Sequence, residues 1–368
     1  MKRASARAAL IAALLITIAS ACLGFSTGAS ADGTTPATPL PPSKVKVTRD
    51  VTYLTDGDLS LTLDIYQPDQ PGDGRPGIVL IHGGAWGTGK SADVAAQARL
   101  LAREGWVAFS VNYRLADADH HPWPDELTDV QRAARWVGAH AIQYGVDPQK
   151  IGALGLSAGG HLAVLLAEVG TTVDATGARI DDPNPPVTIR AVAAWSPPTR
   201  LAGLISPAEG GDPVDCEGDQ KCAQFWRLPL VEHFLGCRPE QCSARYTQAS
   251  PVSRATADTA PVWFSNSTNE ITGMPQAKAL DQALATAGVT HQLQVEQGTQ
   301  HADEYESKIW NDMTPWLATQ LGVAAPPPVS FSGSNILLSP VVVISVVVGL
   351  ALLLVLLAVA LRDDDGAL

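Results

Sequence analysis

The sequence predicts an α/β fold with a mostly parallel central sheet covered by helices on both faces. Short apolar runs typical of buried strands alternate along the chain with segments of helical spacing, and that alternation is typical of parallel sheets. The opening strands, at 48–53 and 59–66, are expected to be antiparallel. Further strands are expected at residues 78–81, 106–111, 151–156, 189–195, 261–265 and 291–296.

The helices expected between these strands are marked by apolar residues at helical spacing. Such spacing occurs over 130–137 and over 277–287, and a helix-like run covers 158–168. The segment 44–322 lies between two Pro-rich stretches and is long enough to bury a full core. We therefore expect it to form one domain.

A serine lies at the junction of the strand 151–156 and the helix that follows it. It is the centre of Gly155-Leu156-Ser157-Ala158-Gly159, which has the G-x-S-x-G layout of a nucleophile elbow. Small residues on either side are needed because the turn is strained and bulky side chains would collide with the strand and helix. Ser157 is therefore the candidate nucleophile, with an ordinary turn serine as the alternative.

A glycine-rich loop follows the strand 78–81. Its sequence, His82-Gly83-Gly84-Ala85-Trp86, matches the H-G-G-x position at which backbone N–H groups form an oxyanion hole. Fixed N–H donors stabilise the negative charge that acyl transfer places on the carbonyl oxygen. We assign this hole to the N–H groups of Gly84, Ala85 and Ala158. His82 is expected to brace the loop, and Trp86 to contact the substrate.

The candidate base and acid follow the last two strands. His301 lies in the loop after 291–296, and it completes the chain order Ser…acid…His. The loop after 261–265 contains one carboxylate, Glu270, which would hold the imidazole in one tautomer. Asn269 could occupy the same position without supplying charge, and Asp281 falls within a helical pattern.

With these motifs the chain resembles α/β-hydrolase esterases of the hormone-sensitive-lipase-like and feruloyl-esterase-like groups. Those families pair H-G-G-x-[WF] with G-x-S-A-G, and the resemblance runs from about Leu61 to about Leu321. It implies an α/β-hydrolase fold and a serine hydrolase mechanism, and says little about substrate. The chain departs from the family pattern at Glu270, where Asp is usual, and at Gly273, where Pro is frequent.

Both ends of the chain carry segments that are not expected to belong to the domain. Residues 1–31 have a basic start, an apolar stretch and an A-x-A cleavage site before Asp32, which predicts a secretory signal peptide. A lipoprotein site at Cys22 is the alternative. A Thr/Pro-rich linker is expected over 32–43.

The C-terminal part is predicted to cross a membrane once. A Pro/Ser/Gly-rich linker at 323–335 precedes a predicted transmembrane helix at 336–361, and a short cytoplasmic tail follows at 362–368. Within that helix 341–361 carries no charge and spans about 31 Å at ~1.5 Å per residue, which matches the hydrocarbon core. The signal peptide then places the domain on the extracytoplasmic face of the plasma membrane.

The segment 199–250 interrupts the alternation of strands and helices, and we expect it to form a flap beside Ser157. Its cysteines predict disulfides, because an even number in a secreted chain is typical of them. Spacing favours two local loops, although crossed pairings and a Cys₄ zinc site remain alternatives. The cysteines are Cys216, Cys222, Cys237 and Cys242. Phe225 and Trp226 are expected either to line an acyl pocket or to form the flap's own core.

Composition restricts the possible partners. The formal net charge is −12 and no basic patch occurs, which argues against nucleic acid. No phosphate-binding loop or metal-ligand cluster is recognisable, so neither a cofactor nor a metal is expected.

The favoured function is a serine hydrolase that cleaves carboxylic esters through an acyl-enzyme. Its substrates would be small-molecule or polysaccharide esters. Amide cleavage, as by an arylformamidase or a peptidase, would use the same residues, and a non-catalytic adhesion module is the third hypothesis.

Overall fold

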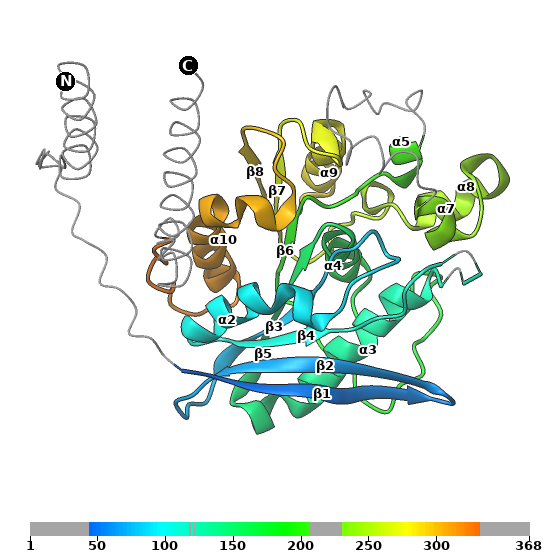
Figure 1. Ribbon diagram of the computed structural model, residues 1–368. Coiled ribbons are helices and arrows are strands. Elements are labelled where there is room, and N and C mark those ends of the chain that lie inside the picture. The colour runs from blue at the N-terminus through cyan, green and yellow to red at the C-terminus, as the bar shows by residue number, and fades with distance from the viewer. Residues whose placement is uncertain (1–43, 118, 121, 206–229, 332–368) are drawn as a thin grey trace, which may run out of the picture. The chain divides into compact units, whose positions relative to one another are not determined.

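The computed structural model describes residues 44–331 except 118, 121 and 206–229, and its centre is an eight-stranded sheet (Figure 1). The strand order is β1-β2-β4-β3-β5-β6-β7-β8. β1 pairs antiparallel with β2, β2 pairs antiparallel with β4, and all remaining pairs are parallel. The bounds are β1 Val45–Asp56, β2 Leu59–Pro68, β3 Arg75–Ile81, β4 Val107–Val111, β5 Val146–Leu156, β6 Val192–Trp195, β7 Val262–Ser267 and β8 His291–Glu296. The expected mostly parallel sheet is confirmed.

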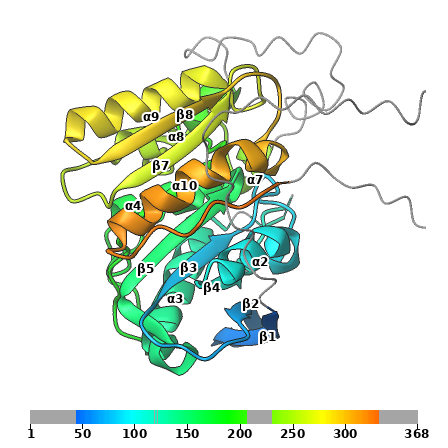
Figure 2. The same ribbon diagram turned by 90° about the vertical axis from the view of Figure 1, so that its left-hand side faces the viewer.

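Helices cover both faces of this sheet (Figure 2). α3 (Asp125–His140), α4 (Ala158–Val169) and α9 (Gly273–Ala287) pack on one face, and α2 (Ala95–Arg103) and α10 (Glu306–Gln320) on the other. β3 shows why two cores form, because its residues alternate in direction. Val79 and Ile81 join the core under α3 and α4, whereas Ile78 and Leu80 join the core under α2 and α10.

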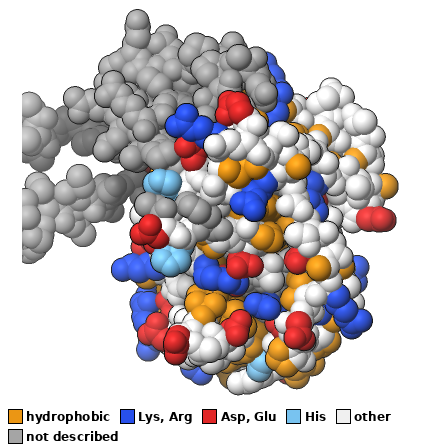
Figure 3. Space-filling model, turned by 90° about the vertical axis from the view of Figure 1, so that its right-hand side faces the viewer, with side chains coloured by type: hydrophobic (Ala, Val, Ile, Leu, Met, Phe, Trp, Pro, Cys, Tyr) orange, Lys and Arg blue, Asp and Glu red, His pale blue; other side chains and the backbone are white. Residues whose placement is uncertain are grey.

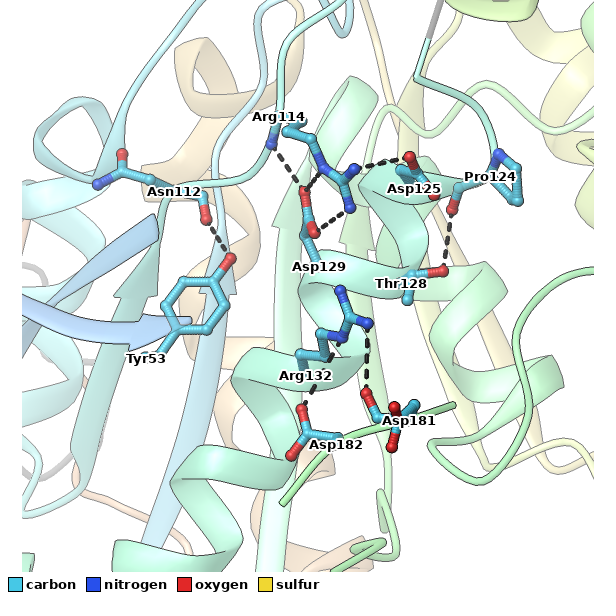
Figure 4. Close-up of polar contacts among 10 residues, drawn as sticks. All are labelled: Tyr53, Asn112, Arg114, Pro124, Asp125, Thr128, Asp129, Arg132, Asp181 and Asp182. Carbon is cyan, nitrogen blue, oxygen red and sulfur yellow. Dashed lines mark hydrogen bonds and ion pairs between the residues drawn. The ribbon is translucent and has the colours of Figure 1, made fainter. Parts of the chain in front are cut away.

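An arginine clamp holds the start of α3 beside the end of β4 (Figure 4). The Arg114 guanidinium donates to both carboxylate oxygens of Asp129, at 2.8 and 2.7 Å, and to Asp125 at 2.6 Å. Asp129 is fully buried, so its charge depends on this bidentate pairing. The clamp fixes the segment that leads from the sheet into α3.

The described part of the predicted flap is helical. It comprises α5 (Leu201–Ile205), α7 (Leu230–Leu235) and α8 (Pro239–Gln248), and η4 (Pro251–Ser253) follows. Cys237 and Cys242 form a disulfide with Cα atoms 6.2 Å apart, which is one of the two local pairings expected. The other pair, Cys216 and Cys222, lies outside the described residues, as do Phe225 and Trp226.

The segments expected at the two ends of the chain also fall outside the described residues. They are the signal peptide at 1–31, the linker at 32–43, the membrane helix at 336–361 and the tail at 362–368. Within the part that the structure describes, no helix is both long and apolar enough to cross a bilayer. On the face shown in Figure 3, basic and acidic side chains are interspersed with apolar ones.

A partly buried carboxyl predicts that stability falls as the pH rises from mildly acidic values to about 8. Glu104, at the C-terminus of α2, accepts a hydrogen bond of 2.6 Å from the Trp310 indole, and burial raises its pKa to about 8. This pKa lies above that of an unfolded-chain carboxyl. The contribution of Glu104 to the free energy of unfolding is therefore complete below the pKa of the unfolded chain. It is lost as the pH rises through the pKa of the folded protein.

Glu104→Gln keeps an acceptor for the indole and removes the titration. We expect it to raise the free energy of unfolding by roughly 2–4 kcal/mol at about pH 9.5, and to change it little at about pH 4. Urea denaturation at the two pH values measures this. An equal effect of the substitution at both would contradict the prediction.

Candidate active site

Ser157 occupies a strained turn between β5 and α4. Its backbone has φ 53° and ψ −118°, a conformation that L-residues rarely adopt and that holding contacts must offset. One such contact is the hydrogen bond of 2.7 Å from its N–H to the Trp195 carbonyl on β6. The turn is therefore built into the sheet, as expected for a nucleophile elbow.

The structure brings three of the sequence-predicted residues together from separate loops. His301 Nε2 lies 2.9 Å from Ser157 Oγ, and His301 Nδ1 lies 2.5 Å from Glu270 Oε2. The other oxygen of Glu270 accepts a hydrogen bond of 2.7 Å from the Ser267 N–H. With Nδ1–H donating to the carboxylate, Nε2 is free to accept the Ser157 proton.

The two other side chains considered for the acid lie elsewhere. Asn269 is exposed, and its backbone N–H donates to the Gly298 carbonyl. Asp281 pairs with a different histidine, His291, at 3.3 Å. Glu270 is the one of the three that contacts His301, and its side chain is fully buried.

The loop after β3 lies against the elbow so closely that side chains would not fit. A Cβ atom on Gly159 would lie 2.2 Å from the Ile81 carbonyl oxygen, and one on Gly83 would lie 3.0 Å from that of Leu156. The loop then turns through Gly84 at φ 114° and Ala85 at φ 51°. Among the described residues, none accepts a hydrogen bond from the N–H of Gly84 or Ala85.

Trp86 differs from the expectation that it contacts substrate. It is fully buried, with its ring stacked on Phe234 at 4.7 Å between centroids. His82 is buried and stacks on Tyr113 at 4.4 Å, in keeping with a bracing role, and burial lowers its pKa. The described residues contain no group of three potential ligands that could hold a metal ion.

Sequence reasoning missed a buried hydroxyl network behind His301. The Tyr305 hydroxyl donates to the Ser265 carbonyl at 3.0 Å and lies 2.7 Å from Ser196 Oγ. Ser196 Oγ in turn accepts a hydrogen bond of 2.9 Å from the N–H of Ala302, the residue after His301. Ser196 and Ala302 both have positive φ, at 50° and 51°, so the network holds a strained loop.

Residues 63–284 of the chain match the BD-FAE family. The chain belongs to the BD-FAE family. This agrees with the resemblance to α/β-hydrolase esterases that the motifs around Ser157 and Gly84 indicated.

Curated relatives of the chain are named as ester hydrolases. The chain is 33% identical over 251 residues to the probable carboxylic ester hydrolase LipM of Mycobacterium tuberculosis, covering 65% of this chain and 53% of LipM. It thus spans about half the length of the curated relatives it matches.

Two solved structures have the same fold. A butyrate-bound esterase of Thermogutta terrifontis is 27% identical with a TM-score of 0.57, covering 78% of this chain and 98% of that one. A truncated carbohydrate esterase from gut microbiota is 22% identical with a TM-score of 0.63, covering 77% and 99%. The similarity to the carbohydrate esterase, at 22% identity, shows the fold alone.

Proposed function

We propose that this BD-FAE protein is a serine hydrolase that cleaves carboxylic esters. The observation that carries the proposal is the continuous hydrogen-bonded series from Ser157 Oγ through His301 to Glu270, with distances of 2.9 and 2.5 Å. Such a series activates a hydroxyl as a nucleophile because the imidazole accepts its proton as it attacks.

In this mechanism Ser157 Oγ attacks the acyl carbonyl while its proton passes to His301 Nε2. The negative charge on the carbonyl oxygen is stabilised by the N–H groups of Gly84, Ala85 and Ala158. The imidazolium then returns the proton to the leaving alcohol oxygen as the ester bond breaks. Water, deprotonated by His301, then attacks the acyl-enzyme, and the imidazolium returns this proton to Ser157 Oγ as the carboxylic acid leaves.

The proposed substrates are esters with short acyl groups, on small alcohols or on carbohydrate. The names of two similar proteins support this class, since one structure holds butyrate and another is of a carbohydrate esterase.

The test is turnover of p-nitrophenyl acetate and butyrate, and of acetylated sugars, by the full chain. Matched anilides of the same acids test the amide hypothesis, and a fluorophosphonate probe labels an activated serine. We expect ester turnover to exceed anilide turnover and the probe to label Ser157. Labelling with faster anilide cleavage would support an amidase, and absence of both labelling and turnover would support a non-catalytic module.

We also propose that the chain is anchored in the plasma membrane with its hydrolase domain on the extracytoplasmic side. The support is the uncharged stretch 341–361 together with the predicted signal peptide. The full chain should remain in the membrane fraction after alkaline carbonate extraction, and external protease should digest the domain in intact cells. Release by carbonate would contradict anchoring.

Tyr305→Phe is expected to lower kcat because Ser196 then loses its tyrosine partner and the loop that carries His301 shifts. A loss of about 10-fold in kcat with little change in KM is in line with the weakening of one or two buried hydrogen bonds. Tyr53→Phe is the matched control. Its hydroxyl donates to the Asn112 carbonyl at 2.6 Å (Figure 4), and neither of these residues is hydrogen-bonded to His301.

Esterase kinetics and thermal unfolding of both variants check this. Both tyrosine variants should lose stability, whereas only Tyr305→Phe should lose kcat. Equal kcat values in the two variants would assign Tyr305 a purely structural role.

A further inference from the structure

A fully buried histidine lies one helical turn after the proposed nucleophile. His161 in α4 has no exposed surface, and its backbone N–H donates to the Ser157 carbonyl at 3.0 Å. Its Nδ1 accepts a hydrogen bond of 3.1 Å from the Trp86 indole, and its Nε2 lies 2.7 Å from the Ala249 carbonyl. Both ring nitrogens are therefore engaged.

These contacts define the protonation state of His161. An indole N–H is only a donor, so Nδ1 must be unprotonated, and a carbonyl oxygen is only an acceptor, so Nε2 must carry the proton. Burial also lowers the pKa of His161 to about 4. The ring is neutral at ordinary pH, which removes it as a general acid or base and leaves it able to bridge two segments.

The bridge joins the two segments that supply the oxyanion hole. Gly84 and Ala85 lie in the same loop as Trp86, which follows β3, whereas Ala158 lies at the start of the helix that carries His161. Fixed donors stabilise a developing charge only if they converge on one oxygen, and displacement by about 1 Å can cost on the order of 100-fold in rate.

The loop that contains Trp86 also requires stabilising contacts because its backbone is strained. Ala85 and Trp86 have consecutive positive φ angles of 51° and 62°, which side-chain-bearing residues adopt only when surrounding contacts hold them. The Trp86 carbonyl accepts a hydrogen bond of 2.9 Å from the Ala116 N–H, and its ring is stacked on Phe234. The indole–imidazole hydrogen bond adds a direct link to the elbow helix.

We propose that His161 is a positioning residue of the oxyanion hole, acting through its hydrogen bond from Trp86. Because Ala249 directly follows α8, the same imidazole also ties the end of the flap to this loop. The inference rests on the proposed ester hydrolase function and adds a residue that does not touch the reacting atoms.

Four single-substitution variants and one double variant of the full chain test the proposal. Trp86→Phe keeps an aromatic ring against Phe234 but removes the N–H donor, and His161→Leu removes both nitrogens. His161→Gln is the conservative variant, because its amide can accept from Trp86 and donate to Ala249. Trp123→Phe is the matched control, since Trp123 also packs on Phe234 but donates to Gln248 at 3.3 Å.

The readouts are kcat and KM for p-nitrophenyl butyrate, and inhibition by a trifluoromethyl ketone, whose tetrahedral adduct places an oxyanion in the hole. We expect Trp86→Phe and His161→Leu to lower kcat and inhibitor affinity by about 10- to 100-fold, with KM changed less than about threefold. His161→Gln should recover most of the loss, and Trp123→Phe should match the wild type. The Trp86/His161 double variant should lose no more than the worse single one.

A purely structural role would lower the melting temperature while leaving kcat and inhibitor affinity of the folded protein unchanged. That result for Trp86→Phe would overturn the proposal, as would additive losses in the double variant. If His161→Leu does not fold, Trp86→Phe and His161→Gln still decide the question. Failure of the proposed function is distinct, because the wild type itself would then show no turnover.

Discussion

Ser157→Ala is expected to lower kcat for short-chain esters by about 10⁵- to 10⁶-fold, as much as removal of His301 would. The alanine removes the oxygen that attacks, and the remaining donors near Gly84 can stabilise charge only for direct attack by water. Esterase assays with p-nitrophenyl butyrate measure the loss, and labelling by a fluorophosphonate should disappear with it.

The loss of kcat caused by Ser157→Ala should not add to the loss caused by substitution of His301. Ser157 and His301 act as one unit, since their 2.9 Å contact carries the proton, so the double variant should be about as slow as either single one. Ser110→Ala is the matched control because that buried hydroxyl donates to the Ser91 carbonyl instead. Retention of wild-type turnover by Ser157→Ala would assign the nucleophile to another residue.

The sheet could be predicted from the sequence because its strands carry local signals. Residues 78–81 form an uninterrupted apolar run, residues 291–296 alternate between polar and apolar side chains, and the structure has strands at both. β5 begins at Val146 instead of 151, since its first residue pairs with Arg75 across a register shift that no local pattern reveals.

Two helices of the second face, α2 and α10, were not predicted. α10 contains Pro315, and the acidic residues Asp303, Glu304 and Glu306 around its start indicate a solvated surface. Its apolar stripe, from Ile309 to Leu317, is buried only because it meets β6 and β7. The helical spacing of Ile309, Met313 and Leu317 is present in the sequence, but it does not identify the strands that bury these residues.

The candidate site also contains residues that could be predicted from the sequence and residues that could not. Ser157, His301 and Glu270 were predictable because each follows a strand, and the carboxyl ends of parallel strands meet at one edge of the sheet. Tyr305 and His161 were not, since their partners lie far away in sequence: Ser196 for the first, and Trp86 and Ala249 for the second. Trp86 was expected at the surface of the site and is instead buried behind it.

Glu270→Gln is expected to lower kcat by about 10³- to 10⁴-fold with a smaller change in KM. The carboxylate accepts the Nδ1–H of His301 at 2.5 Å, which leaves Nε2 facing Ser157 as an acceptor. An amide in the same place can donate to Nδ1 and so favours the tautomer whose Nε2 carries a proton. It also cannot stabilise the imidazolium that forms during attack.

Two control variants test whether Asn269 or Asp281 performs this role in place of Glu270. Asn269→Ala removes the exposed amide next to Glu270, and Asp281→Asn removes the carboxylate that pairs with His291. Both should retain kcat within about threefold, because neither side chain contacts His301. Since Glu270 is fully buried and also accepts from the Ser267 N–H, thermal unfolding must show that Glu270→Gln is folded at the assay temperature. A folded Glu270→Gln with near-wild-type kcat, together with a large loss in Asp281→Asn, would move the acid to α9.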